Sequence, residues 1–206
     1  MPPTYPALRQ FLLAHCGIPE SIIEATLRRY AEPQRHYHTV EHLARMVMAV
    51  ESHAIALTQA QTLALLFHDA VYVPGAQGGK NEQESCLLLR SLAREHVEPD
   101  TLDITARIIL DTIHHIPTQA PSSVVLDLDL LGLAGPIAEV FRDGDLIFKE
   151  NAHLVVDWDD YSARRSRFLQ GLLDRPQILY SAELRHHEDT LRQNLRDVIR
   201  ARNQAQ

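Results

Sequence analysis

The segment at about 59–70 constrains the fold of this chain more than any other part of the sequence. Drawn as a helix, it is apolar on nearly every side, so it should be the helix that is buried in the interior. Thr58, followed three positions later by Gln61, has the pattern of a capping box and predicts where this helix begins. The helix ends at the polar pair His68-Asp69. Its apolar residues are Leu63, Leu65, Leu66, Phe67 and Ala70.

The rest of the chain also predicts helices, which are separated by glycine, proline and short polar turns. Gly17 and Pro19 divide the first apolar pattern, between residues 8 and 31, into two helices. We expect Thr39, Asn81 and Asp100 to cap three further helices. The patterns that follow the buried helix lie, with approximate bounds, at 81–96, 100–115, 136–149, 159–173 and 181–203.

Residues 124–132 are apolar apart from two aspartates and a glycine, and their periodicity does not distinguish a helix from a strand. We favour a short helix, because the sequence contains no other strand with which this segment could pair. No internal repeat or low-complexity linker is visible. The sequence therefore predicts an all-α fold in one domain spanning 1–206, with a core at about 20–135 and C-terminal helices at about 136–203.

The charge and the cysteine content exclude several classes of protein. Lys and Arg number 20 against 27 for Asp and Glu, and a net charge of −7 lacks the basic footprint of a nucleic-acid binder. A small anionic substrate would therefore need a locally positive site. Cys16 and Cys86 form no CxxC pair, which fits a reducing cytoplasm. A cationic leader and a run of about 18 apolar residues are both missing, so we expect neither secretion nor a membrane span.

The chain has twelve histidines, and their positions matter more than their number. His38 and His42 are four residues apart, so on a helix both imidazoles would face one site. His68 and Asp69 end the apolar helix, where an unpaired carboxylate would be costly to bury and a bound cation would remove that cost. Imidazoles with a carboxylate suit Zn²⁺, Mn²⁺, Fe²⁺ or Ni²⁺ rather than Ca²⁺, and Co²⁺ and Mg²⁺ stay open.

Three segments together resemble a known family. The tract 35–42, which contains His36, His38 and His42, is followed by His68-Asp69 and, after a longer interval, by Asp127-Leu128-Asp129. This order resembles the HD superfamily of metal-dependent phosphohydrolases, and in particular a bacterial branch of it. The resemblance covers roughly residues 5–200. It implies an HD-domain-like helical bundle that binds a divalent metal ion and hydrolyses a phosphate ester.

The resemblance also implies a set of metal ligands. Asp127 and Asp129 compete for one position, because a helix points two residues at this spacing in different directions. We choose Asp127, and we keep His38 as a substitute for the first histidine. Carried over position by position, the ligands fall on His42, His68, Asp69 and Asp127.

One departure from the better-studied enzymes of this superfamily concerns the general acid. No glutamate directly follows the His-Asp pair here, since Ala70, Val71 and Tyr72 occupy the next positions. The acid must then come from elsewhere, and Glu82 is our candidate, acting beside Asp69. The candidates for contact with a phosphate are Arg35, His38, Lys80, His114 and His115.

The sequence therefore predicts a phosphohydrolase acting on a small phosphorylated metabolite or nucleotide. The alternative is a metal-binding helical module that binds a nucleotide without turnover, because the expected acid is missing. A less favoured alternative is a zinc peptidase, since 38–42 matches H-x-x-E-H with Glu41 as the base, although this leaves His68-Asp69 unexplained. A phosphatase of the haloacid dehalogenase type would need residues 124–130 to form a strand.

We expect no nucleic-acid or membrane partner, and a homodimer stays open.

Overall fold

The computed structural model describes residues 5–204, and within this range the protein is all-helical, as predicted, with no strand. Short turns join the helices, and single 3-10 turns follow α7 and α8 and precede α10. The helices are α1 (Pro6–His15), α2 (Glu20–Arg29), α3 (Val40–Ser52), α4 (Gln59–Phe67), α5 (Lys80–Ala93), α6 (Pro99–Asp111), α7 (Ser122–Leu130), α8 (Ile137–Asn151), α9 (Trp158–Leu173) and α10 (Glu188–Gln204).

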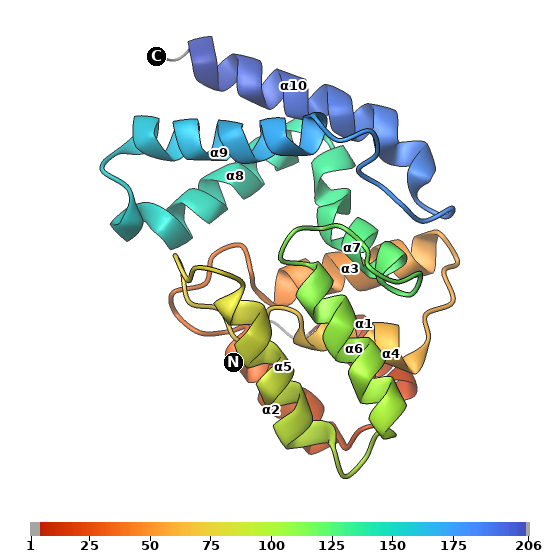
Figure 1. Cartoon of the computed structure of the whole chain (residues 1–206). Coiled ribbons are helices and arrows are strands. Elements are labelled where there is room, and N and C mark those ends of the chain that lie inside the picture. The colour runs from red at the N-terminus through yellow and green to blue at the C-terminus, as the bar shows by residue number, and fades with distance from the viewer. Residues whose placement is uncertain (1–4, 205–206) are drawn as a thin grey trace.

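The helices form two groups, each with its own apolar core. Helices α1 to α7 pack as a lower bundle, and α8, α9 and α10 lie together across its top (Figure 1). The end of α7 joins the two groups, because Leu128 belongs to the lower core and Leu130 to the upper one. Leu184, from the connection between α9 and α10, returns to the lower core. The two groups therefore share an interface that chain segments cross more than once.

Helix α4 lies in the interior of the lower bundle, as its apolar sequence predicts. Leu63, Leu65 and Leu66 are fully buried, and α4 contacts α1, α2, α3, α5, α6 and α7. Burying each of these side chains contributes roughly 1.5–3 kcal/mol to stability. The predicted capping box is confirmed: the Thr58 hydroxyl accepts from Gln61 N–H, and the Gln61 side chain accepts from Thr58 N–H. The position of His68 is therefore fixed by a helix that packs against every other helix of the lower bundle.

Helix α7 settles the ambiguity of residues 124–132 in favour of a helix. It begins at Ser122 and is followed by a 3-10 turn at Leu131–Ala134. Val125 packs in the lower core while Leu130 packs in the upper one, so the helix is buried on two sides. Burial on two sides removes the polar face that would otherwise reveal a helical period.

Two of the predicted caps are wrong. The N-cap of α5 is Gly79, in a left-handed conformation with φ of 72°, and the Asn81 side chain instead pairs with the backbone of Val73. Helix α6 begins at Pro99, one residue before Asp100, because proline suits the first turn of a helix. In both cases a residue with restricted or special backbone geometry decided the helix start, rather than a side-chain cap.

Thr39 and the last helix also differ in detail from the sequence prediction. Thr39 does stand at the N-cap of α3 with an extended backbone, but its side chain makes no capping hydrogen bond. The last helix begins at Glu188 rather than at residue 181, because Tyr180 and Ser181 donate their backbone N–H groups to Asp127. These two hydrogen bonds fix the backbone at residues 180 and 181, so this segment does not join the helix.

No helix between residues 5 and 204 combines the length and the apolar character that crossing a membrane requires. Cys16 and Cys86 are both free thiols in the lower bundle, and both are buried. Burial raises the pKa of the Cys16 thiol to about 12 and that of Cys86 to about 11. These cysteines are therefore packing residues of low reactivity.

Candidate metal centre and adjoining pocket

Three helices bring four polar side chains to one point. His42 comes from α3, His68 and Asp69 from the end of α4, and Asp129 from α7. His68 Nε2 lies 3.0 Å from an Asp69 oxygen and 3.8 Å from Asp129 Oδ1, and His42 Nε2 lies 3.1 Å from the same Asp129 oxygen. Donor atoms of His42, His68 and Asp69 all lie within 4.8 Å of one another. We call these four residues the floor.

The orientation of His68 is fixed by a backbone carbonyl. Its Nδ1 lies 3.0 Å from the carbonyl oxygen of Leu65, and since a carbonyl only accepts, Nδ1 carries the proton. In its neutral form the ring would therefore turn the bare lone pair of Nε2 toward the carboxylates of Asp69 and Asp129. Two acceptors facing a lone pair are repulsive unless a proton or a cation lies between them.

Proton affinities within the floor reflect the same arrangement. Burial alone would lower the pKa of His68, but the charges of Asp69 and Asp129 outweigh it and raise that pKa to about 9. Burial would raise the pKa of Asp129, but the hydrogen bond from His115 and the nearby imidazole of His42 hold it well below its usual range. The floor thus attracts positive charge strongly.

The floor passes a test for metal binding that does not depend on any family. His42 Nε2 and His68 Nε2 are buried, and neither has a hydrogen-bond partner of good geometry among residues 5–204. Buried polar atoms without partners are rare in folded proteins and call for an explanation. Donors held by one ion at about 2.0–2.2 Å lie about 3–4 Å apart, which fits the contacts of 3.0, 3.1 and 3.8 Å. Two imidazoles with two carboxylates suit a divalent transition metal.

Asp127, our chosen fourth ligand, lies elsewhere, and this choice is corrected to Asp129. The carboxylate of Asp127 is fully buried and accepts from the backbone N–H groups of Tyr180 at 2.8 Å and Ser181 at 2.6 Å. Two residues apart on a helix point to nearly opposite sides. On α7, the side of Asp129 faces His42 and the side of Asp127 faces the segment before α10.

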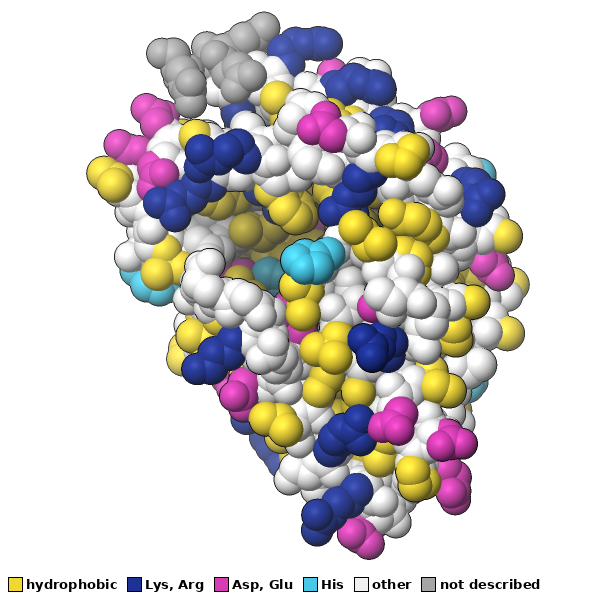
Figure 2. Space-filling model, in the orientation of Figure 1, with side chains coloured by type: hydrophobic (Ala, Val, Ile, Leu, Met, Phe, Trp, Pro, Cys, Tyr) yellow, Lys and Arg dark blue, Asp and Glu magenta, His cyan; other side chains and the backbone are white. Residues whose placement is uncertain are grey.

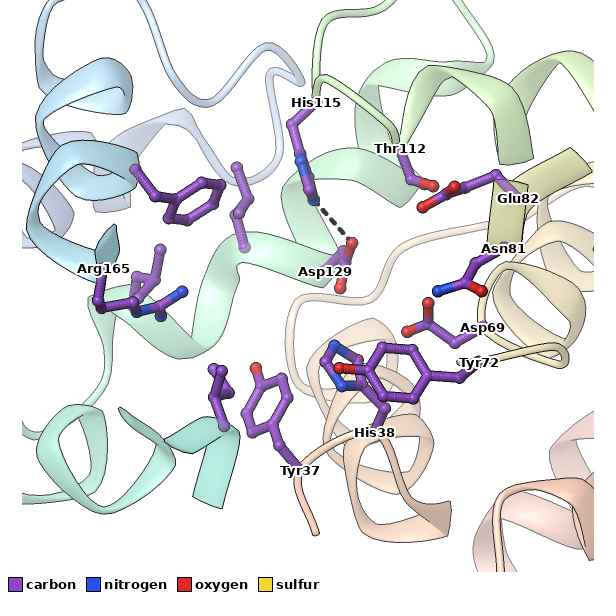
Figure 3. A pocket seen from close by; sticks show the side chains of 14 residues that line it. Tyr37, His38, Asp69, Tyr72, Asn81, Glu82, Thr112, His115, Asp129 and Arg165 are labelled. Atoms are coloured by element: carbon purple, nitrogen blue, oxygen red, sulfur yellow. Dashed lines mark hydrogen bonds and ion pairs between the residues drawn. The ribbon is translucent and has the colours of Figure 1, made fainter. Parts of the chain in front are cut away.

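A pocket of about 200 Å³ opens above the carboxylates of Asp69 and Asp129. Figure 2 shows a hollow between the upper helices and the lower bundle, with hydrophobic and histidine side chains around it and cationic side chains above it. In Figure 3, Arg165 lies on the opposite side of the pocket from Asp69 and Glu82. Ile147, Arg165 and Phe168, from α8 and α9, cover the floor, and we call these three residues the roof.

His115 lines the pocket and contacts the floor, whereas its neighbour does not. His115 Nε2 lies 2.9 Å from the second carboxylate oxygen of Asp129 (Figure 3). Its backbone has a φ of 49°, a conformation that a residue with a side chain adopts at a cost. Arg175 donates to the carbonyl oxygens of both His114 and His115, which supports that conformation. His114 itself is exposed and is not among the residues that line the pocket.

His38 also lines the pocket, and a glutamate that the sequence did not single out holds it there. Glu150 of α8 accepts from the backbone N–H groups of residues 36, 37 and 38 at 2.8–2.9 Å. Its other oxygen lies 2.7 Å from His38 Nδ1 and 3.2 Å from the Tyr72 hydroxyl. Burial would raise the pKa of Glu150, but the hydrogen bond and charge of His38 lower it to about 2. Burial would lower the pKa of His38, but the charge of Asp69 and the hydrogen bond and charge of Glu150 raise it.

Arg35, predicted to bind substrate, is instead buried beneath the site. It donates to the carbonyl oxygens of His38, Asp69 and Ala70, and it contacts the Glu32 carboxylate. Its guanidinium also lies over the rings of Tyr30 and Tyr72. All three guanidinium nitrogens are engaged, so Arg35 positions the backbone of the floor and has no donor directed at a substrate.

The two candidates at the start of α5 have different outcomes. Glu82 lines the pocket beside Thr112, and burial, the largest of several effects, raises the pKa of its carboxyl (Figure 3). Lys80 is exposed, and it does not line the pocket. The side chains at the two positions point to different sides, because they are two residues apart on one helix.

Arg165 is the cation of the roof, and it is not among the residues predicted from the sequence. Its guanidinium lies 5.1 Å from the centre of the Phe168 ring, and among residues 5–204 it has no hydrogen-bond or ion-pair partner. The sequence does carry a signal, since Arg165 stands four residues after Tyr161 and four before Leu169, both of which are buried. An arginine on the apolar side of a helix is unusual and points to a role inside the molecule.

Two alternative readings of the sequence do not fit this geometry. Glu41, the base of the H-x-x-E-H pattern, is exposed and lies 3.8 Å from Arg142, while the adjacent His42 is buried in the floor. The glutamate and its histidine therefore face different surroundings. Residues 124–130 form a helix, which removes the strand that a haloacid-dehalogenase-type site requires.

Comparison with protein-family models, with curated proteins and with solved structures gave no match to this chain. The resemblance to the HD superfamily therefore stays a prediction of the sequence. The geometry of the floor, by contrast, is a property of the fold: donor atoms of His42, His68 and Asp69 lie within 4.8 Å of one another, and Asp129 lies against both imidazoles.

Proposed function

We propose that the chain is a metal-dependent phosphohydrolase of the HD type that cleaves a phosphate ester of a small metabolite. One observation carries the proposal: two buried imidazole nitrogens without hydrogen-bond partners face two carboxylates beneath a pocket. Such an arrangement suits a divalent metal ion held by His42, His68, Asp69 and Asp129. When bound, the ion supplies the Lewis acidity needed to activate water at neutral pH.

The roof supplies the positive charge that a phosphate requires. Because the chain carries a net charge of −7 and the floor adds two carboxylates, an anionic substrate needs a local cation. Arg165 lines the pocket opposite Asp69 and has no partner among residues 5–204, so its donors are free to pair with phosphate oxygens. His115 and His38 border the same space and can donate further hydrogen bonds.

The leaving group needs a proton donor, and two side chains are in position. Glu82 lines the pocket, and its raised pKa favours the protonated form that an acid requires. His38 lines the other side, where Glu150 fixes the ring through Nδ1 and leaves Nε2 directed away from that contact. Variants of the two residues, compared in the same assay, identify the donor.

The size of the pocket narrows the substrate class. Sites for drug-sized ligands occupy about 300–1,000 Å³, whereas this pocket has a volume of about 200 Å³. A phosphorylated metabolite with a compact leaving group fits this space better than an intact nucleotide. Buried free thiols and the acidic net charge further support a cytoplasmic enzyme without nucleic-acid partners.

Metal analysis and phosphate release test the proposal together. The purified chain, loaded in turn with Mn²⁺, Co²⁺, Ni²⁺ or Zn²⁺, is assayed for inorganic phosphate release from a panel of small sugar phosphates and nucleotides. We expect turnover that Asp69→Asn abolishes and that Asp145→Asn, an exposed carboxylate on α8, leaves unchanged. Metal binding without turnover on any substrate would favour the helical binding module instead. An inert, metal-free chain would remove both functions.

A further inference from the structure

A second cluster of imidazoles lies away from the pocket. His53 follows the last residue of α3, and His186 and His187 belong to the 3-10 turn before α10. One ring nitrogen from each of the three lies within 4.8 Å of the others, and the ring centres of His53 and His187 are 5.1 Å apart. His53 follows His42 by eleven residues, or about 16 Å along α3 at about 1.5 Å per residue, so the cluster is separate from the floor.

The free nitrogen of His53 points toward its partners. Its Nδ1 lies 2.9 Å from the carbonyl oxygen of Ala49, which only accepts, so Nδ1 carries the proton. Nε2 therefore has a lone pair, and it lies 2.9 Å from His187 Nε2. Either one proton joins the two rings or both lone pairs face a shared cation. The backbone bond on Nδ1 is the same kind of support that metal-binding histidines normally have.

The ligand atoms of the cluster indicate which cation it would bind. The potential ligand atoms in this group are all imidazole nitrogens. Imidazole ligands select Zn²⁺, Cu²⁺ or Ni²⁺ over Mg²⁺, Ca²⁺ or Mn²⁺. His186 is exposed, which leaves one side of the cluster open to water.

The connection before α10 reaches α3 through independent anchors. Leu184 is buried in the lower core, and Asp127 holds the backbone of Tyr180 and Ser181. His186 and His187 follow directly, so the fold, rather than chance contact of surface side chains, brings them to His53. An ion at this point would join the end of α3, whose first turn carries His42, to the start of the helix that covers the top of the molecule.

From this placement we propose a second metal site, in which His53, His186 and His187 bind Zn²⁺ or a similar late transition-metal ion. It joins the lower bundle to the upper helices and is structural. The site does not depend on the phosphohydrolase proposal, because it shares no residue with the floor.

The test uses the full-length chain with the floor disabled by Asp69→Asn and Asp129→Asn. We expect calorimetric titration with Zn²⁺ to give one site per chain in this background, and Co²⁺ to give visible absorption bands. His53→Ala and, separately, His187→Gln should each weaken Zn²⁺ binding by about 100-fold or more. His96→Ala, which removes an exposed histidine in the turn after α5, serves as the matched control and should change nothing.

A second measurement avoids substitutions within the cluster. In the floor-disabled chain, Zn²⁺ should protect His53, His186 and His187 from diethyl pyrocarbonate and leave His96 reactive, as read by peptide mass spectrometry. It should also raise the melting temperature, because an ion that binds only the folded chain stabilises it. Absence of Zn²⁺ binding in this background, or binding that survives His53→Ala, overturns the proposal and leaves a hydrogen-bonded histidine pair.

Discussion

The floor and the roof of the pocket are built in different ways. The floor comes from the ends of α3 and α4 and from α7, and its histidines and Asp69 stand in short sequence motifs. The roof comes from α8 and α9, and Glu150 ties α8 back to residues 36–38 across more than 110 positions of the chain. The floor thus concentrates negative charge and lone pairs, whereas the roof contributes a cation. We therefore expect the floor to determine metal binding and the roof to determine substrate binding.

The largest expected effect separates the two aspartates of α7. Asp129→Asn should weaken metal binding by about 100-fold or more and remove activity, since it takes one carboxylate from the floor. Asp127→Asn should leave metal affinity unchanged and lower the free energy of unfolding by about 1–3 kcal/mol, because its amide N–H₂ would face a backbone N–H. Metal titration and urea unfolding of both variants provide the measurement. The reverse pattern would restore Asp127 as the ligand.

Glu150→Gln tests the tie between α8 and the floor. The folded pKa of Glu150 is about 2, below its ordinary value of 4.5, so the carboxylate stabilises the fold above pH 4.5 and loses that effect as the pH falls toward 2. The pKa of His38 is raised, so the stability that its protonated ring contributes is fully present below pH 6.5. This contribution is lost as the pH rises further. The variant should therefore be less stable by at most about 3 kcal/mol, with the largest difference at about pH 4.5–6.5.

Urea unfolding at several pH values checks this expectation for Glu150. Glu139→Gln, an exposed carboxylate in the first turn of the same helix, is the matched control and should show only a small difference. A stability difference for Glu150→Gln that is the same at pH 2.5 and pH 5.5 would contradict the role of its charge.

Arg165→Ala probes the roof alone. Loss of a charge-assisted hydrogen bond to phosphate should reduce kcat/KM by roughly 10–100-fold, since such bonds are worth about 1.5–3 kcal/mol, while metal affinity stays unchanged. Arg164→Ala removes the neighbouring guanidinium, which is exposed and pairs with Asp160, and should leave kcat/KM as it was. Equal effects of the two substitutions would mean that general charge, and not the position of Arg165, assists the substrate.

The smallest expected effect concerns the helix that delivers His68 to the floor. Thr58→Ala removes the capping hydroxyl of α4 and should lower the free energy of unfolding by about 1 kcal/mol without changing kcat. Ser91→Ala, at an exposed position of α5, should change stability by less than about 0.5 kcal/mol. Thermal unfolding and steady-state kinetics of both variants test this, and a lowered kcat in Thr58→Ala would show that the floor depends on the cap.

Much of the fold follows from local sequence. The capping box at Thr58 and Gln61 and the stop at Gly17 depend on neighbouring residues, and the structure contains both. The helix starts at Gly79 and Pro99 were missed because backbone geometry there outweighed the side-chain caps that the sequence offered. Local signals therefore predicted the helices well and their first residues less well.

The sequence by itself determined the helical character of residues 5–204, because hydrophobic period is a local property, and the resemblance to the HD superfamily grouped His42, His68 and Asp69 as predicted metal ligands. Only the tertiary structure decided between Asp127 and Asp129, since that choice depends on which side of α7 faces α3. The tertiary structure also shows that Arg35, predicted to bind substrate, instead supports the backbone of the floor. It places Arg165 in the lining of the pocket. The physical reason is that a charged side chain acquires its role from the partners that packing supplies, and these partners lie far away along the chain.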